Sequence, residues 1–115
     1  MDVLYEDDLL QIRHTVTPYG LAISGDVDAT NQAVLTRCLL SLDGVCPYLT
    51  VDLHKVRFIS FSAVHVLASF AHALEPGRRL VLLTCAPAVG RMLRACGWDE
   101  MAGLQMTVME EDNDA

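Results

Sequence analysis

The sequence predicts an α/β domain in which a mixed β-sheet carries three main helices, in the order β-β-α-β-α-β-α-β. Three observations support this class. Short runs alternate apolar and polar residues, as strands do, and longer runs repeat apolar residues every three or four positions, as helices do. Glycine and proline separate several of these runs. The stretch at residues 79–85 contains a continuous Leu-Val-Leu-Leu run, which is typical of a strand buried on both faces of a parallel sheet.

The first half of the chain supplies two strands and one helix. Residues 9–16 alternate well enough from Leu10 onward to form an edge strand, and Pro18 to Gly20 make a turn into a second strand at residues 21–24. These two strands should form a hairpin, preceded by a loose acidic lead at residues 1–8. Asp28 then stands where it can cap a helix whose apolar residues repeat at helical spacing, and Gly44 can close that helix.

The centre of the chain reads as a buried strand, a short basic connector and an amphipathic helix. Residues 49–53 alternate as a strand, and Ser60 stands at the N-cap of the helix that follows. The spacing predicts an apolar face made of Phe61 or Ala63, Val66 or Leu67, Phe70 and Leu74. The opposite face should carry Ser62, His65, Ser69 and His72.

The last third supplies a strand, a helix and a final strand. Residues 75–77 break the pattern before the strand at 79–85, and Pro87 suits the first turn of the next helix. Gly97 is a natural C-cap for that helix, and Trp98 should fold back over its last turn. Residues 104–109 read as the final strand, followed by a charged tail at 110–115 that we expect to be mobile.

Composition bounds the classes of function. The 115 residues, 52% of them hydrophobic, match one small domain with a core at about residues 8–109. A net charge of −7 argues against a nucleic-acid backbone or an anionic membrane as the main partner. The longest apolar run is too short to span a bilayer, and the acidic N-terminus differs from a signal peptide. These features predict a cytoplasmic protein.

No motif for a metal, a cofactor or catalysis stands out. Cysteines at 38, 46, 85 and 96 form no CxxC pair and no histidine lies at zinc-site spacing, so we expect small core residues. The glycines are isolated, which gives nucleotide binding no support. Ser62 and His65 could touch on one helix, but a catalytic triad also needs a carboxylate that orients the histidine, and none is obviously placed to do so. We therefore expect no enzyme activity.

Ser62 is the residue of greatest interest, because it lies at the second position of the central helix. Unpaired amides and the positive end of the helix dipole stabilise added negative charge there, which suits a phosphate. The alternative is that the serines at this helix start are only caps.

At these residues the chain resembles a known family. The string VDLHKVRFISFSAVHVL is similar to the central signature of STAS domains (sulfate transporter and anti-sigma factor antagonist), with Asp52 and Leu53 at the strand end and Phe58 and Ile59 as the apolar pair. Ser62 falls on the hydroxyl that accepts phosphate in antagonists of this family. Ser60, Phe61 and Ala63 stand where the family has Asp, a first Ser and Gly. The turn GDVD at residues 25–28 resembles the family's Gly-Glu-Leu-Asp turn beside the acceptor helix.

The resemblance implies a non-enzymatic anti-sigma factor antagonist. Its partner would be an anti-sigma factor with serine kinase activity, and phosphorylation of Ser62 would end the association. The expected partner-binding residues are Asp26, Asp28, Ser60, Phe61, His65 and Ser69. Capping alone is the alternative for Asp28. The alternative function is a STAS adaptor or scaffold subunit that is never phosphorylated, and the oligomeric state stays open, with a homodimer as one alternative.

Overall fold

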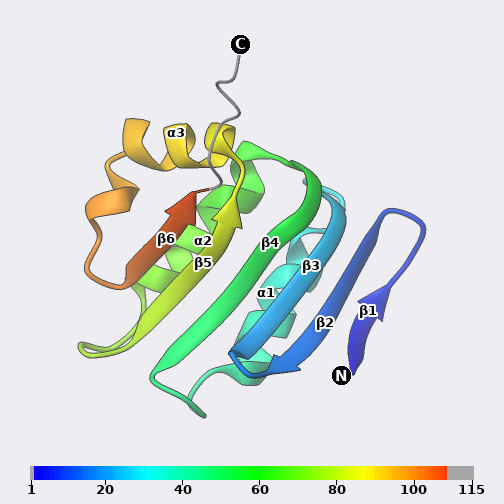
Figure 1. The fold of residues 1–115 in the computed structure, drawn as a ribbon, viewed down its shortest axis with the longest axis horizontal. Coiled ribbons are helices and arrows are strands. Elements are labelled where there is room, and N and C mark those ends of the chain that lie inside the picture. The colour runs from blue at the N-terminus through cyan, green and yellow to red at the C-terminus, as the bar shows by residue number, and fades with distance from the viewer. Residues whose placement is uncertain (1, 109–115) are drawn as a thin grey trace.

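The computed structural model describes residues 2–108 as one six-stranded sheet with α1 and α2 behind it (Figure 1). The strands are β1 (Val3–Glu6), β2 (Leu10–Val16), β3 (Tyr19–Val27), β4 (Tyr48–Ile59), β5 (Arg79–Cys85) and β6 (Leu104–Val108). The helices are α1 (Gln32–Leu42), α2 (Phe61–His72) and α3 (Pro87–Ala95), followed by the short 3-10 helix η1 (Trp98–Glu100). The predicted fold class, a mixed sheet with three main helices, is confirmed.

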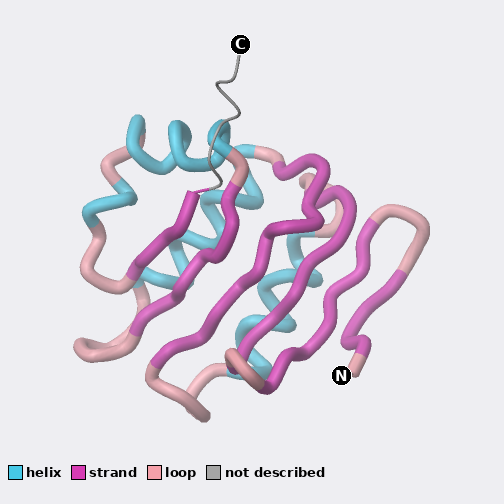
Figure 2. The backbone as a smooth tube through the Cα atoms, in the orientation of Figure 1, coloured by secondary structure: helices cyan, strands magenta, loops and turns pink. Residues whose placement is uncertain are grey.

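The order of strands in the sheet is their order in the chain. β1, β2 and β3 pair antiparallel, whereas β3, β4, β5 and β6 pair parallel, each joined to the next by one of the three helices (Figure 2). The carboxyl ends of the parallel strands therefore meet at one edge of the sheet, where α1, α2 and α3 begin. Within residues 2–108, no helix is long and apolar enough to cross a membrane.

The predicted acidic lead contains a strand, so the element order has one strand more than expected. β1 pairs with β2, which makes β1 the edge strand instead of β2. Asp7 stabilises the turn between β1 and β2, because its carboxylate accepts hydrogen bonds from the backbone amides of Leu9 and Leu10 at 2.8 and 2.9 Å. Most side chains of β1 are exposed, so no buried apolar pattern marks this strand in the sequence.

Two strands run further than the alternation predicted. β3 continues through Val27, so most of the GDVD turn belongs to the strand. β4 includes the stretch expected to be a basic connector and ends only at Ile59. Pairing with β3 along this whole length explains the extension, because Asp26 and Val27 are in register with Phe58 and Ile59.

The buried face of α2 matches the predicted one at Ala63 and Leu67 and differs elsewhere. Ala63, Val64, Leu67, Ala68 and Ala71 are buried. The face therefore consists largely of small residues. Phe70 and Val66, expected in the core, lie at its margin and are only partly buried, and Phe61 is exposed.

The C-terminal third matches the prediction in its strands and caps. Pro87 begins α3, and Gly97, with a φ of 73°, follows its end in the left-handed conformation that glycine favours. The indole ring of Trp98 packs against side chains of α2. The predicted final strand is observed up to Val108; Met109 and the charged tail at 110–115 lie outside the described residues.

The four cysteines are free thiols, and only two of them are core residues as predicted. Cys38 and Cys85 are buried, and burial raises the pKa of the Cys85 thiol to about 11. Cys46 is half-buried and Cys96 is exposed.

Candidate functional site

The start of α2 is fixed to the end of β3 by Ser60. Its side-chain oxygen accepts a hydrogen bond from the amide of Ala63 at 3.1 Å, which confirms the predicted N-cap. Its own amide donates to the carbonyl of Val27 at 2.9 Å. The N-terminus of α2 therefore lies beside the segment that leads from β3 into α1.

Ser62 connects the starts of α2 and α1. Its hydroxyl donates to the side-chain oxygen Oε1 of Gln32 at 2.7 Å, and it lies 3.1 Å from the hydroxyl of Ser60. The side chain is half-buried, which is less exposure than a free acceptor on the solvent face would have. Gln32, the first residue of α1, was not singled out in the sequence, because nothing local relates it to a residue thirty positions away.

The β3–α1 segment is shaped by Gly25 and Asn31. Gly25 has a φ of 100°, and a Cβ there would lie 2.0 Å from the carbonyl oxygen of Leu9, so only glycine fits. Asn31 is only 5% exposed; its side chain accepts from the amide of Asp28 and donates to the carbonyl of Asp26, both at 2.9 Å. Sequence reasoning missed Asn31, although an asparagine directly before a helical repeat is a recognisable signal for a helix start.

Asp28 is not the N-cap of α1, as the sequence predicted, because the helix begins only at Gln32 and Asn31 occupies the capping position. Its carboxylate instead accepts from the amide and the hydroxyl of Thr30. These two hydrogen bonds hold the pKa of Asp28 below its ordinary value. Asp28 thus stabilises the turn that precedes the helix.

Asp26 lies at the outer end of β3 and contacts Arg57 of β4. The shortest distance between the guanidinium and the carboxylate is 3.4 Å, and the Arg57 side chain is 70% exposed. An ion pair this long and this exposed adds little to stability. Both charged groups remain accessible to a partner.

An aromatic cluster extends the surface along α2. The ring of Phe61, which is 54% exposed, stacks on Trp98 with centroids 5.8 Å apart, and the ring of His65 lies 5.4 Å from Trp98. His65 Nδ1 is 3.5 Å from the hydroxyl of Ser69, one turn further on. Both His65 and Ser69 are exposed, as predicted. Trp98 was not predicted to join this surface, because its contacts come from a segment more than thirty residues away.

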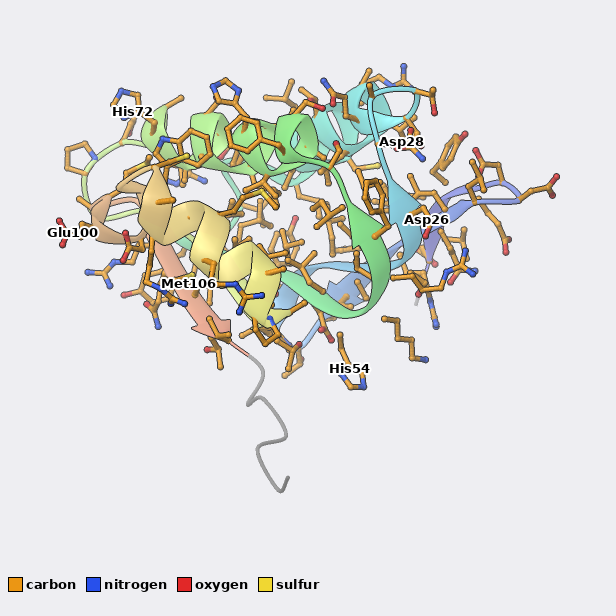
Figure 3. All side chains as sticks on the ribbon, turned by 90° about the horizontal axis from the view of Figure 1, so that it is seen from above. Asp26, Asp28, His54, His72, Glu100 and Met106 are labelled. Carbon is orange, nitrogen blue, oxygen red and sulfur yellow. The ribbon has the colours of Figure 1, made fainter. Side chains whose placement is uncertain are left out.

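The predicted site residues thus form two adjoining groups, and Figure 3 shows Asp26 and Asp28 of the first group. Asp26, Asp28, Ser60 and Ser62 surround the junction of β3, α1 and α2. Phe61, His65 and Ser69 continue along α2. Ser62 bonds to Gln32 and His65 contacts Ser69, so the structure does not pair these two as nucleophile and base. Among residues 2–108, no group of three or more potential metal ligands is found.

Comparison with known proteins gives this fold a family. The family model described as "Mlab, STAS domain" matches residues 10–107. Among curated proteins, no sequence matches the chain. Among solved structures, an anti-sigma factor antagonist from Mycobacterium paratuberculosis is similar, with a TM-score of 0.65 and 20% identity over 90% of this chain and 81% of that one. The anti-sigma factor antagonist SpoIIAA in its unphosphorylated form has a TM-score of 0.57 and 20% identity over 89% of both chains.

The match of the family model covers almost the whole sheet and all three helices, and the two solved structures share the fold. It includes the segments that carry Asp26, Asp28, Ser60 and Ser62. The chain belongs to the STAS domain family.

Proposed function

We propose that this chain is a regulatory protein-binding domain that acts as an anti-sigma factor antagonist. The observation that supports this proposal most directly is the 2.7 Å hydrogen bond from Ser62 to Gln32, which joins the start of α2 and the β3–α1 turn in one surface. Membership of the STAS family and the similarity to two antagonists support this role. The partner would be an anti-sigma factor with serine kinase activity, which the unmodified chain binds in the cytoplasm.

Phosphorylation of Ser62 would end the association. A phosphate adds about −1.5 to −2 charges, which must be desolvated when the surface is covered. The two side chains that contact the hydroxyl, Gln32 and Ser60, carry no positive charge to offset it. Asp26 and Asp28 lie on the adjoining turn, so the modified surface would be more acidic still. Binding can then lose several kcal/mol unless the partner supplies a cation.

The kinase reaction itself belongs to the partner. ATP would bind the kinase, and this chain would supply only the acceptor hydroxyl. We therefore assign the chain no catalytic activity and no cofactor.

The test is affinity purification of the tagged chain from its own cells, read by mass spectrometry for partners and modified sites. The parent should bring down an anti-sigma factor with a kinase fold and carry one phosphate at Ser62. Ser62→Ala should lose the phosphate and keep the partner, whereas Ser62→Asp should lose the partner. Ser41→Ala changes an exposed serine of α1 outside the expected partner-binding residues; it is the control and should keep the phosphate.

The second candidate is an adaptor that is never phosphorylated. The half-buried position of Ser62 and its two hydroxyl contacts favour it, because a side chain already engaged in this way serves as a link between helices. If Ser62→Ala and Ser62→Asp both bind the partner like the parent, and no phosphate is found in cells, the adaptor function replaces the switch.

A further inference from the structure

β4 extends well beyond its neighbour β5. The last matched pair between them is Asp52 with Leu83, whereas β4 stays paired with β3, across two shifts of register, as far as Ile59. From Leu53 onward, therefore, one edge of β4 has β3 beside it, and the opposite edge pairs with no strand in the described part of the chain. We call residues 53–59 the β4 overhang.

The β4 overhang and the start of α3 enclose an apolar cavity of about 270 Å³. Leu53, Val56 and Ile59 line it from the strand, and Ala88, Val89 and Met92 line it from the helix. In Figure 3 the green end of β4 and the yellow α3 face each other across this region. Sites that enclose a drug-sized ligand run from about 300 to 1,000 Å³, so this cavity suits a side chain better than a whole small molecule.

We propose that the β4 overhang binds an extended peptide segment of a partner protein, which adds as a strand and inserts an apolar side chain into the cavity. An open strand edge presents backbone donors and acceptors in a regular row, and another backbone complements such a row. Main-chain hydrogen bonds would give affinity, and the cavity would select the side chain. An apolar small molecule could fill the cavity but would leave the edge unpaired.

The positive charge of Arg57 should also select which peptides bind. Arg57 also lines the cavity, its side chain is 70% exposed, and its contact with Asp26 is 3.4 Å long. A guanidinium has five N–H donors, so Arg57 retains donors for a carboxylate of the incoming peptide. The bound segment should therefore carry an acidic residue beside its apolar anchor. The inference goes beyond the proposed function, because it requires neither an anti-sigma factor nor Ser62.

The test is selection of phage-displayed random dodecapeptides on the full chain, with counter-selection on Ala88→Phe. Ala88 is exposed on α3 and lines the cavity, so a phenyl group there should fill it. Ala95→Phe is the matched control: it lies on the same helix, is exposed and does not line the cavity. Enriched peptides should alternate apolar residues and include an acidic one.

A synthetic copy of the most enriched peptide should bind the parent and Ala95→Phe alike, and Ala88→Phe at least about tenfold more weakly. Arg57→Gln should weaken it as well. Bound peptide should slow hydrogen exchange of backbone amides in the β4 overhang. This measurement uses the parent chain, so it tests the proposal even if Ala88→Phe does not fold. Equal binding to Ala88→Phe, no enrichment over that variant, or binding that leaves exchange unchanged would overturn the proposal.

Discussion

The contact between Ser62 and Gln32 can be tested by a double-mutant cycle with Ser62→Ala, Gln32→Ala and the combined variant. The two side chains are uncharged, half-buried and 2.7 Å apart, which is an ordinary strong O–H···O geometry. A neutral hydrogen bond contributes about 0.5 to 1.5 kcal/mol net, because folding exchanges it for hydrogen bonds to water. We expect a coupling free energy of about 1 kcal/mol between the two positions.

Urea unfolding followed by circular dichroism gives the four free energies of unfolding, and the slope against urea should be the same in all of them. Gln32→Ala combined with Ser69→Ala is the control cycle, since Ser69 lies two turns further along α2 and contacts His65 instead. That cycle should be additive to within about 0.3 to 0.5 kcal/mol. A Ser62–Gln32 coupling no larger than the control would refute the contact and, with it, the joined surface.

The size of this coupling bears on phosphorylation. A hydrogen bond of about 1 kcal/mol lowers the fraction of molecules in which the Ser62 hydroxyl is free of Gln32 only about fivefold. Kinase access is therefore compatible with the contact, and the adaptor function needs more support than the hydrogen bond alone.

Further predictions concern the core, the turn and the binding surface. Leu67→Ala should cost about 3 to 5 kcal/mol because Leu67 is fully buried, while Phe70→Ala should cost clearly less because Phe70 lies at the margin; urea unfolding compares them. Hydrogen bonds from Thr30 lower the pKa of Asp28, so the Asp28 carboxylate contributes stability above its unfolded pKa, and this contribution is lost as pH falls through the lower folded pKa. Asp28→Asn should therefore reduce the loss of stability in acid, measured by urea unfolding across that pH range. His65→Glu should leave the thermal unfolding midpoint within a few degrees of the parent and weaken capture of the partner, because the side chain is exposed. Asp26→Ala with Asp28→Ala should likewise reduce partner capture more than stability, since a lost turn contact costs about 1 kcal/mol; unchanged capture would make the turn structural only.

Local chemistry made much of the fold predictable from the sequence. Ser60, Pro87 and Gly97 each act within one helical turn, so their types and positions mark helix ends without knowledge of the rest of the molecule. β5 was visible as a short apolar run, although only Leu80, Leu82 and Cys85 are buried in it and Val81 and Leu83 are half-buried. β1 was missed because its place depends on pairing with β2 and its side chains are mostly exposed.

The buried face of α2 was predicted correctly at Ala63 and Leu67 and wrongly at Phe61 and Phe70, because spacing alone favours the largest apolar residues. In the structure Ala63, Ala68 and Ala71 share the buried face with Val64 and Leu67. At the end of α2 the backbone of Gly103 comes so close that a Cβ there would lie 2.3 Å from the carbonyl oxygen of Ala71. Phe61 is exposed instead and stacks on Trp98, in the aromatic part of the candidate surface.

The departures from the family signature change the chemistry of this surface in a definite direction. Phe61 stands in place of a serine and leaves 54% of its surface in solvent, as does Phe58 three residues earlier. Exposed aromatic side chains are enriched among the residues that dominate binding energy, whereas a serine hydroxyl contributes little to it. Under the proposed function, affinity would come from the aromatic residues, and a phosphate on Ser62, the residue after Phe61, would control it, because a charge placed beside apolar groups must be desolvated when they are covered. One surface can in this way combine strong binding with release, without the acidic residue and the glycine of the usual motif.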